Sequence, residues 1–386
     1  MNSIIDIKFL FKFLFIYLLI QLSTGAVLPG EWPAIDKPPT ILPEFTKLVD
    51  LSKVPNAPVR TASDVSSGKC SDNDEYCTWG CKNCIRNQTD VITCPNAGDW
   101  ALTLDDGPSP YTPAILDFLE AQNIKVTFFV VGSRVFESPE ILQRAYKFGH
   151  QIGIHTWSHP SLTTQSNEQV IAELQWTAKA IKAAIGVTPS FMRPPFGDYD
   201  DRIRNICEQL GYKIVIWDRD TNDWVSDTDK SFNLQWVEGN FTGWVKEAGQ
   251  PGHISLQHDL YPGAAGQVQP VINVLTKAGY KVKPVGTCLG VNNFYGGNAT
   301  IPVPQNSTTN TSANPLAAYT KSPQSSNTPN IPNTPNNPKT PTTTQPSTPT
   351  QLESAKKSLA IKSTNFDNFL WSFIIGAILF TAVFLK

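Results

Sequence analysis

The chain lacks an excess of charge of either sign. Among its 386 residues, 31 are Lys or Arg and 33 are Asp or Glu, which gives a formal net charge of −2. Proteins that bind nucleic acid usually carry a basic footprint, and this balance provides none. We therefore expect no nucleic-acid partner, and an uncharged polysaccharide or a small molecule fits better. Hydrophobic residues make up 40% of the chain, so a sizeable core can form.

The apolar run near the N-terminus is too short for a full bilayer crossing. It extends over Phe13–Leu22 and follows Lys8 and Lys12, and small residues lead from its end to Ala26. This order is typical of a secretory signal that is cleaved, here over residues 1–26. The alternative is a signal anchor that stays in the membrane.

The C-terminal segment is also apolar. The run over Phe369–Leu385 is followed by Lys386 alone. An apolar tail behind a polar spacer predicts a GPI-anchor signal over 356–386, with a plain tail anchor as the alternative. Residues 298–355, which are rich in Ser, Thr, Pro and Asn, have too little apolar surface to offset chain entropy and predict a disordered stalk. Such a stalk commonly carries O-linked sugars.

A secreted protein can be N-glycosylated, and the acceptor pattern occurs five times in this chain. Three of the five positions lie at the start of the stalk. The acceptors are Asn87, Asn240, Asn298, Asn306 and Asn310. Together these segments predict a secreted glycoprotein held at the outer face of the plasma membrane.

The seven cysteines lack the second ligand cluster that a zinc finger needs. Four of them fall within 70–84, and no group with finger spacing follows, so disulfides are a better interpretation than a zinc knot. Cys94 and Cys288 bracket the patterned middle and could join its ends, whereas Cys207 lies in a helical pattern and could be a buried thiol. The disulfide candidates are therefore Cys70, Cys77, Cys81, Cys84, Cys94 and Cys288, in pairings that the sequence leaves open.

Strand and helix patterns alternate between these cysteines. The expected strands are 100–104, 126–131, 151–155, 190–193, 213–217, 253–257 and 281–285, and the expected helices are 113–121, 140–148, 167–185, 200–210, 230–248 and 268–278. Alternation of this kind predicts parallel strands joined by right-handed crossovers. Periodicity does not choose between a barrel and a doubly wound sheet.

Polar side chains follow five of these strands. They are Asp105 and Asp106, His155 and His159, Arg193, then Asp218, Asp220 and Asp223, and finally His258 and Asp259. The carboxyl ends of parallel strands face one side of the sheet, so these residues should converge in one cleft. Each fragment alone also has a plainer interpretation, such as a turn at Asp105–Gly107 or a pair of core histidines.

Histidine is scarce, and its placement is therefore informative. Three of only five histidines occur here, as His155, His159 and His258. A His-x-x-x-His pair with one Asp can form a catalytic metal site that keeps open positions for water and substrate.

At this point the chain resembles a known family, the polysaccharide deacetylases, also called the NodB-homology family or carbohydrate esterase family four. Five motifs carry the resemblance, in order and at fitting intervals: Thr103-Leu104-Asp105-Asp106-Gly107, His155-Thr156-Trp157-Ser158-His159, Arg193-Pro194-Pro195-Phe196-Gly197, Asp220-Thr221-Asn222-Asp223-Trp224 and Ser255-Leu256-Gln257-His258-Asp259. The resemblance covers 98–288 and implies a distorted (β/α)7 barrel. The cysteine-bearing extension over 27–97 and the stalk look most like those of fungal chitin deacetylases.

Two positions depart from the family pattern. Leu104 stands where Phe is usual, on the core side of a strand, so little should change. Phe196 stands where Tyr is common, which removes a hydroxyl but keeps the backbone N–H that the family uses.

The resemblance also implies roles for individual residues. Asp106, His155 and His159 would hold one divalent ion, zinc or cobalt. Asp105 would be the general base with Arg193 as its orienting partner, and His258 would be the general acid held by Asp223. Phe196 would stabilise the oxyanion through its N–H, and Trp224 and Trp157 would line the cleft, although both could equally be core residues.

The implied activity is metal-dependent removal of N-acetyl groups from chitin, which yields chitosan and acetate. Peptidoglycan and acetylated xylan are alternative substrates. A second class of function is a cell-wall glycan-binding glycoprotein with an inactive barrel.

Overall fold

The computed structural model describes residues 28–71, 73–247, 251–291 and 293–296. The predicted signal sequence, stalk and anchor lie outside these ranges, as do Asn298, Asn306 and Asn310. Within the described ranges, no helix has both the length and the apolarity that a membrane crossing requires.

A parallel sheet forms the centre of the described part. Its strands are β1 (Asp90–Val91), β2 (Asp99–Asp105), β3 (Thr127–Val130), β4 (Gln151–Ile154), β6 (Phe191–Met192), β7 (Lys213–Val215), β8 (Arg219–Asp220), β9 (His253–His258) and β10 (Lys281–Val282). They pair in the order β1-β7-β6-β4-β3-β2-β9-β8, and β10 pairs with the start of β2. A separate antiparallel pair joins β5 (Thr188–Pro189) to β11 (Tyr295–Gly296).

The pairing confirms the predicted distorted barrel. The order runs from β1 to β8 without joining these two strands, so the barrel is open. All seven expected strands are present, whereas β1 and β8, each of two residues, have no predicted counterpart.

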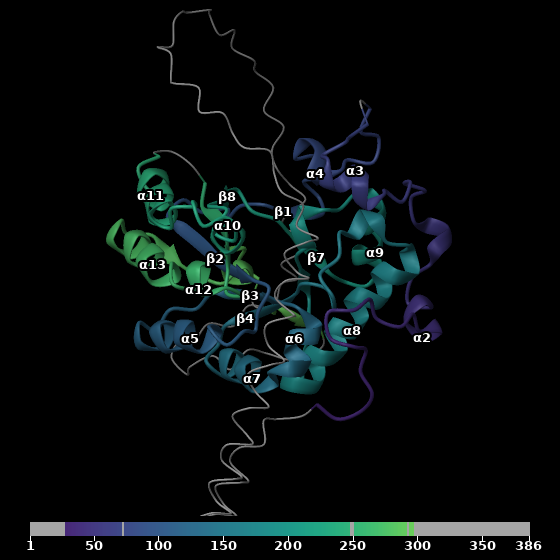
Figure 1. Ribbon diagram of the computed structural model, residues 1–386, viewed down its shortest axis with the longest axis horizontal. Coiled ribbons are helices and arrows are strands. Elements are labelled where there is room, and N and C mark those ends of the chain that lie inside the picture. The colour runs from purple at the N-terminus through teal and green to yellow at the C-terminus, as the bar shows by residue number, and fades with distance from the viewer. Residues whose placement is uncertain (1–27, 72, 248–250, 292, 297–386) are drawn as a thin grey trace, which may run out of the picture. The chain divides into compact units, whose positions relative to one another are not determined.

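Helices lie around the outside of the strands (Figure 1). Six correspond to predicted ones: α5 (Thr112–Ala121), α7 (Pro139–Lys147), α8 (Asn167–Ile185), α9 (Asp201–Gln209), α11 (Gln235–Trp244) and α13 (Val268–Lys277). The predicted helix 230–248 is too long. Asp229 accepts a hydrogen bond from the Ser231 N–H at 2.8 Å, and this local turn separates the short helix α10 (Val225–Thr228) from α11. The sequence also missed α6 (Gly132–Glu137), α12 (Pro262–Ala265) and α14 (Val285–Cys288).

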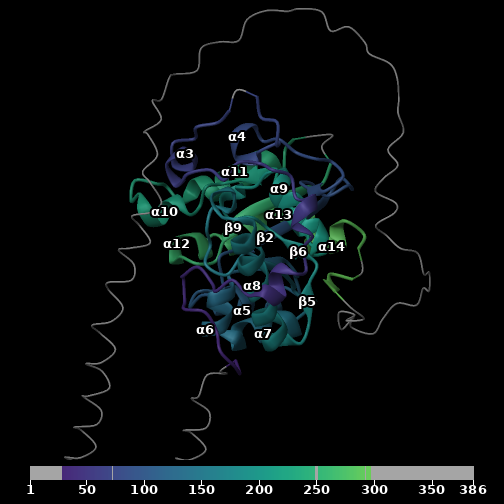
Figure 2. The same ribbon diagram turned by 90° about the vertical axis from the view of Figure 1, so that its right-hand side faces the viewer.

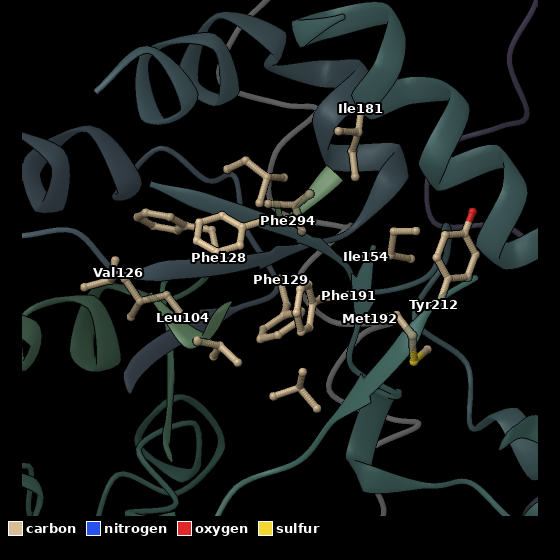
Figure 3. Packing of buried hydrophobic residues seen from close by; sticks show 14 of the residues in the cluster. Leu104, Val126, Phe128, Phe129, Ile154, Ile181, Phe191, Met192, Tyr212 and Phe294 are labelled. Carbon is tan, nitrogen blue, oxygen red and sulfur yellow. The ribbon is translucent and has the colours of Figure 1, made fainter. Parts of the chain in front are cut away.

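Both faces of the central strands are buried, which explains their continuous apolar character. Every residue of β2 and of β3 is buried. Phe128 and Phe129 project to opposite sides of β3 (Figure 3). The ring of Phe129 occupies the place where a Cβ at Gly153 would lie, 2.5 Å away, so β4 needs a glycine beside it.

The cysteine-bearing extension packs onto the barrel. It contains α2 (Pro43–Thr46), α3 (Ala62–Ser66) and α4 (Trp79–Lys82), and Figure 2 shows α3 and α4 at one end of the molecule, far from α7. Trp32 stacks on Trp157 with ring centroids 6.1 Å apart, and the indole N–H of Trp176 on α8 donates to the Thr40 carbonyl at 2.9 Å. The extension is therefore part of the same folded unit.

The structure confirms the disulfide interpretation and resolves the pairing. Cys70 bonds to Cys81, Cys77 to Cys84 and Cys94 to Cys288, while Cys207 is a buried free thiol.

The Cys94–Cys288 bond spans 194 residues and should contribute more stability than the Cys70–Cys81 bond, which spans 11. Loop-closure entropy gives about 5 kcal/mol for the long span and about 3 kcal/mol for the short one. We expect the Cys94→Ala/Cys288→Ala pair to lower the free energy of unfolding more than Cys70→Ala/Cys81→Ala, as measured by urea titration. An equal or smaller loss for the long span would contradict this ranking.

Candidate metal centre and active site

The pairing of strands brings most of the predicted polar residues to one edge of the sheet. Asp105 ends β2 and His258 ends β9, and the two residues are direct neighbours in the parallel register. His155 follows β4, and Arg193 follows β6. The side chains therefore come from strands that are far apart in the sequence.

Three ligand-type side chains meet at this edge. The Nε2 atoms of His155 and His159 lie 3.3 Å and 3.1 Å from Oδ1 of Asp106. One ligand atom from each residue lies within 4.8 Å of the others. Zinc holds such atoms about 2.0–2.1 Å from itself in a tetrahedron, which places neighbouring ligand atoms about 3.3 Å apart. The spacing in this trio therefore fits one small divalent cation.

The hydrogen bonding of the trio supports the same fit. Nδ1 of His155 lies 2.8 Å from the Arg193 carbonyl oxygen, which can only accept, so this nitrogen carries the hydrogen. Oδ1 of Asp106 is buried without a hydrogen-bond partner among the described residues. Burial alone would raise the pKa of Asp106, but the neighbouring His159 and His155 outweigh it and hold this pKa well below its usual range. A buried carboxylate oxygen that faces two imidazoles without a hydrogen bond is the arrangement that a cation stabilises.

The loops that carry these ligands have unusual backbone conformations. Asp106, Thr156, His159 and Phe196 all have positive φ, between 59° and 80°. A non-glycine residue rarely adopts this region, and it persists where the surroundings fix it. At Asp106 the fixing contact is a 2.7 Å hydrogen bond from Nη1 of Arg134 to its carbonyl oxygen.

Asp105 lies beside the trio and has a different partner. Nη1 of Arg193 donates to its Oδ1 at 2.9 Å, and its Oδ2 lies 3.8 Å from Nε2 of His155. Arg193 is fully buried and also donates to the carbonyl oxygens of Val215 and Ile216. These contacts fix the guanidinium, which in turn orients the Asp105 carboxylate toward the trio of Asp106, His155 and His159.

His258 forms a hydrogen-bonded pair with Asp223. Its Nδ1 lies 2.7 Å from Oδ1 of Asp223, and its backbone N–H donates to Oδ2 of the same carboxylate at 2.9 Å. Burial disfavours the charged imidazolium. The charge and hydrogen bond of Asp223, with smaller contributions from Asp106 and Asp105, outweigh burial and raise the pKa of His258 to about 10. His258 therefore carries a proton at neutral pH.

The aromatic residues that were expected to line the cleft differ in position. The Phe196 side chain is 43% exposed and packs edge-on against His159, with ring centroids 4.6 Å apart. Trp224 is partly buried.

The expectation for Trp157 is wrong. This side chain is fully buried, its indole N–H donates to the Ala34 carbonyl, and its ring lies against Trp32 and Trp176. It cannot contact a sugar and belongs to the core.

Asp218 also differs from the sequence expectation. It lies 2.6 Å from Nδ1 of His253, at the start of β9, and so faces away from the strand end that carries His258.

Sequence reasoning missed two residues that hold the site together. Glu173 on α8 accepts hydrogen bonds from the loop between His155 and His159. Arg134 on α6 contacts Asp106. Glu173 could have been found from the sequence, because it is a charged residue on the buried face of the predicted helix 167–185. Arg134 could not, because α6 was not predicted.

Asp259, which was noted only as a strand-end residue, fixes the first loop. Its carboxylate fills the space where a Cβ at Gly107 would lie, and it accepts from the Thr112 hydroxyl. Burial, with the nearby charges of Asp106 and Asp105, raises the pKa of Asp259 to about 7.

Comparison with known proteins gives consistent matches. The polysaccharide deacetylase family model matches residues 93–215. Chitin deacetylase 1 of Cryptococcus neoformans is 43% identical over 290 residues, which is 70% of this chain and 61% of that protein. The chitin deacetylase of Amylomyces rouxii is 34% identical over 288 residues, 69% of this chain and 68% of that protein. The first of these matches thus spans less than two thirds of its relative.

A solved structure has the same fold. The chitin deacetylase from Colletotrichum lindemuthianum matches with a TM-score of 0.51 at 30% identity, covering 55% of this chain and 96% of that one.

The geometry predicts that Asp106 is required for metal binding and that His258 is not. Since Asp106 contributes the oxygen that faces both imidazoles, we expect Asp106→Ala to weaken zinc binding by more than about a hundredfold. His258→Ala is the matched control and should keep wild-type affinity. Isothermal titration of metal-free protein measures both. Wild-type affinity in Asp106→Ala would show that the ion binds elsewhere.

Proposed function

The chain belongs to the polysaccharide deacetylase family, and on that premise we propose that it hydrolyses the N-acetyl groups of N-acetylglucosamine units in chitin, releasing acetate and leaving chitosan. The observation that carries this proposal is the convergence of Asp105, Asp106, His155, His159 and His258 at one end of the barrel. It supplies a metal site, a base and an acid in one place.

We propose that Asp106, His155 and His159 hold one divalent cation. Two imidazoles and one carboxylate suit zinc or cobalt, and the choice in the cell follows availability as well as affinity. A cation at this position lowers the pKa of a nearby water and polarises a carbonyl oxygen.

Asp105 is the proposed general base. An amide carbonyl is a poor electrophile, so the attacking water must lose its proton as it adds. Asp105 is suited to take this proton because it lies beside the trio and because the hydrogen bond from Arg193 orients its carboxylate.

His258 is the proposed general acid. The amine that leaves an amide is a strong base and departs only when it is protonated. The raised pKa of His258 keeps the imidazolium populated at neutral pH, and the hydrogen bond to Asp223 aims Nε2 away from Asp223. The proton then passes from His258 to the departing nitrogen, and acetate and a free glucosamine unit remain.

The backbone N–H of Phe196 is the proposed donor to the oxygen of the tetrahedral intermediate. Losing one donor of this kind typically costs about 3–4 kcal/mol of transition-state stabilisation. The proposed role of Trp224 is to pack against an apolar pyranose face. Trp157 has no part in this proposal.

Chitin is the preferred substrate because relatives that match over most of this chain bear the name chitin deacetylase. A deacetylase acting on peptidoglycan or acetylated xylan would use the same residues. The other alternative, an inactive glycan-binding glycoprotein, has little support, because the residues of the proposed metal site, base and acid are all present.

We also propose that the protein acts at the cell wall or the outer face of the membrane, on a GPI or tail anchor. The three disulfides suit an oxidising compartment. Asn87 and Asn240 are exposed at the surface, where a glycosylating enzyme could reach them.

The deciding experiment measures acetate released from chitin oligomers by the purified domain. We expect release that a chelator abolishes and that zinc or cobalt restores. Acetylated xylan oligomers and a peptidoglycan fragment, assayed in parallel, identify the substrate class. Tight binding of chitin oligomers with no acetate from any of these glycans would instead support the inactive alternative.

Replacing the proposed base separates chemistry from metal binding. Asp105→Asn keeps a similar shape but accepts a proton poorly, so kcat should fall by about a hundredfold to ten-thousandfold while zinc affinity stays close to that of the wild type. Steady-state kinetics and metal titration on the same sample check both parts. Full turnover in this variant would show that another group is the base.

Replacing the partner of His258 should change the pH dependence of turnover. Without the Asp223 charge, burial lowers the pKa of His258 from about 10 toward or below its ordinary 6.5. The acid form is then lost at neutral pH, so the alkaline limb of the kcat profile should move down by more than one pH unit in Asp223→Asn. An unchanged limb would show that another group is the acid.

A further inference from the structure

Glu173 is a charged residue on the buried face of a helix. It lies on α8 and is 0% exposed, with Val170, Leu174 and Ile181 buried near it on the same helix. A buried carboxylate without a cationic partner is costly unless several donors satisfy it. The hydrogen-bond donors to the Glu173 carboxylate therefore indicate the role of this residue.

All three recorded donors come from the loop between the two histidines of the proposed metal site. One oxygen, Oε2, accepts the N–H groups of Trp157 and Ser158, each at 2.8 Å. The other, Oε1, accepts the Ser158 hydroxyl at 2.7 Å. These two residues directly precede His159, so the carboxylate fixes the peptide planes that lead into this ligand.

The backbone of the same loop includes conformations that persist only when surrounding contacts fix them. Thr156 and His159 at its two ends have φ values of +66° and +59°, which non-glycine residues rarely adopt. The carbonyl oxygens of Thr156 and Trp157 accept from the N–H groups of Gly132 and Ser133. Glu173 thus fixes the N–H side of the loop, and α6 fixes the carbonyl side.

We propose that Glu173 is a positioning residue of the metal centre, whose carboxylate holds the Trp157–Ser158 peptide so that His159 faces Asp106. This role rests on the proposed metal site. Glu173 does not touch the proposed ligand atoms, and it acts through the Trp157 and Ser158 N–H groups and the Ser158 hydroxyl. Its effect should therefore depend on the reach of the side chain more than on its charge.

The chemistry of Glu173 allows reach and charge to be separated. Burial raises the pKa of Glu173 to about 7, so its neutral form is populated near neutral pH. Glutamine has nearly the shape of that neutral form and can still accept both N–H groups at one oxygen. Aspartate keeps the charge but is one methylene shorter, so it cannot make the same hydrogen bonds from α8.

The test compares Glu173→Gln, Glu173→Asp and Glu173→Leu for zinc affinity, measured by competition with a chelator, and for the visible absorption spectrum of the cobalt-loaded protein. Outer contacts of this kind typically change metal affinity about 10–100-fold. We expect Glu173→Gln to stay within about threefold of wild type, and Glu173→Asp and Glu173→Leu to bind zinc at least about tenfold more weakly, with an altered cobalt spectrum.

Two further variants separate positioning from folding. Asp90→Asn is the control for loss of a buried carboxylate outside the site, because Asp90 lies on β1, accepts from the Arg86 N–H and forms an ion pair with Arg204. It should lose stability and keep zinc affinity. Ser158→Ala removes only the bond to Oε1 and should weaken zinc binding by a few fold, which decides the question if Glu173→Leu does not fold.

Three results would contradict the proposal, and each identifies which part of it is wrong. Wild-type zinc affinity in Glu173→Asp and Ser158→Ala would overturn the positioning role. A loss in Glu173→Gln as large as that in Glu173→Asp would show that charge, and not reach, is what matters, and would overturn it as well. If wild-type protein itself binds no zinc or cobalt, the proposed metal centre is wrong, and that result is distinguishable from the others.

Discussion

The site depends on one electrostatic constraint, which is that three electron-rich atoms are held together away from water. Oδ1 of Asp106 lies within 3.3 Å of Nε2 on both His155 and His159, and it has no hydrogen-bond partner among the described residues. An unpaired polar atom of this kind costs free energy when it is buried. The fold must therefore supply that free energy elsewhere, or a cation must neutralise the cluster. A cation bound between these atoms would offset that cost, which is why the arrangement supports the proposed metal site.

Buried carboxylates hold the loops that create this constraint. Glu173 accepts the N–H groups before His159, Asp259 fills the space beside Gly107, and Asp198 accepts from the N–H and hydroxyl of Thr163 in the turn that follows. Glu173 and Asp259 contact the residues next to the proposed ligands His159 and Asp106. Short loops with left-handed residues have few conformations of similar energy, so a single carboxylate with two or three donors is enough to select one. The extension also contributes, since Trp32 stacks on Trp157, which lies in the loop between the two histidines.

Local patterns predicted the alternating parallel strands and helices and the polar residues at the strand ends, whereas the barrel and the residue roles came from the family resemblance. Strands such as β3 are continuous apolar runs, and the proposed ligands lie in the loops after β2 and β4, which parallel topology brings to the same edge of the sheet. The sequence could not predict features that depend on contacts between distant elements. The burial of Trp157 requires Trp32 from the extension, the pairing of Asp218 with His253 requires the register of β8 on β9, and β1 and β8 are too short to give a periodic signal. Trp157 illustrates the limit well, because an aromatic residue between two ligands has the same local sequence whether it faces a sugar or the core.

His155 and His258 have different hydrogen-bond partners at Nδ1, and these partners suit the different roles proposed for the two residues. His155 directs Nδ1 at a neutral carbonyl oxygen, that of Arg193, which fixes the hydrogen on Nδ1 and leaves the Nε2 lone pair for a cation. His258 directs Nδ1 at the carboxylate of Asp223, whose charge stabilises the imidazolium and keeps a proton on Nε2. A carboxylate partner raises the pKa of an imidazole, whereas a neutral carbonyl oxygen fixes the tautomer without adding a charge. Because metal-ligating histidines also commonly donate to carboxylates, the Nδ1 partner alone does not separate the proposed ligand from the proposed acid. The surroundings of Nε2 complete the distinction, since Nε2 of His155 lies 3.3 Å from Oδ1 of Asp106, beside the second imidazole of the trio.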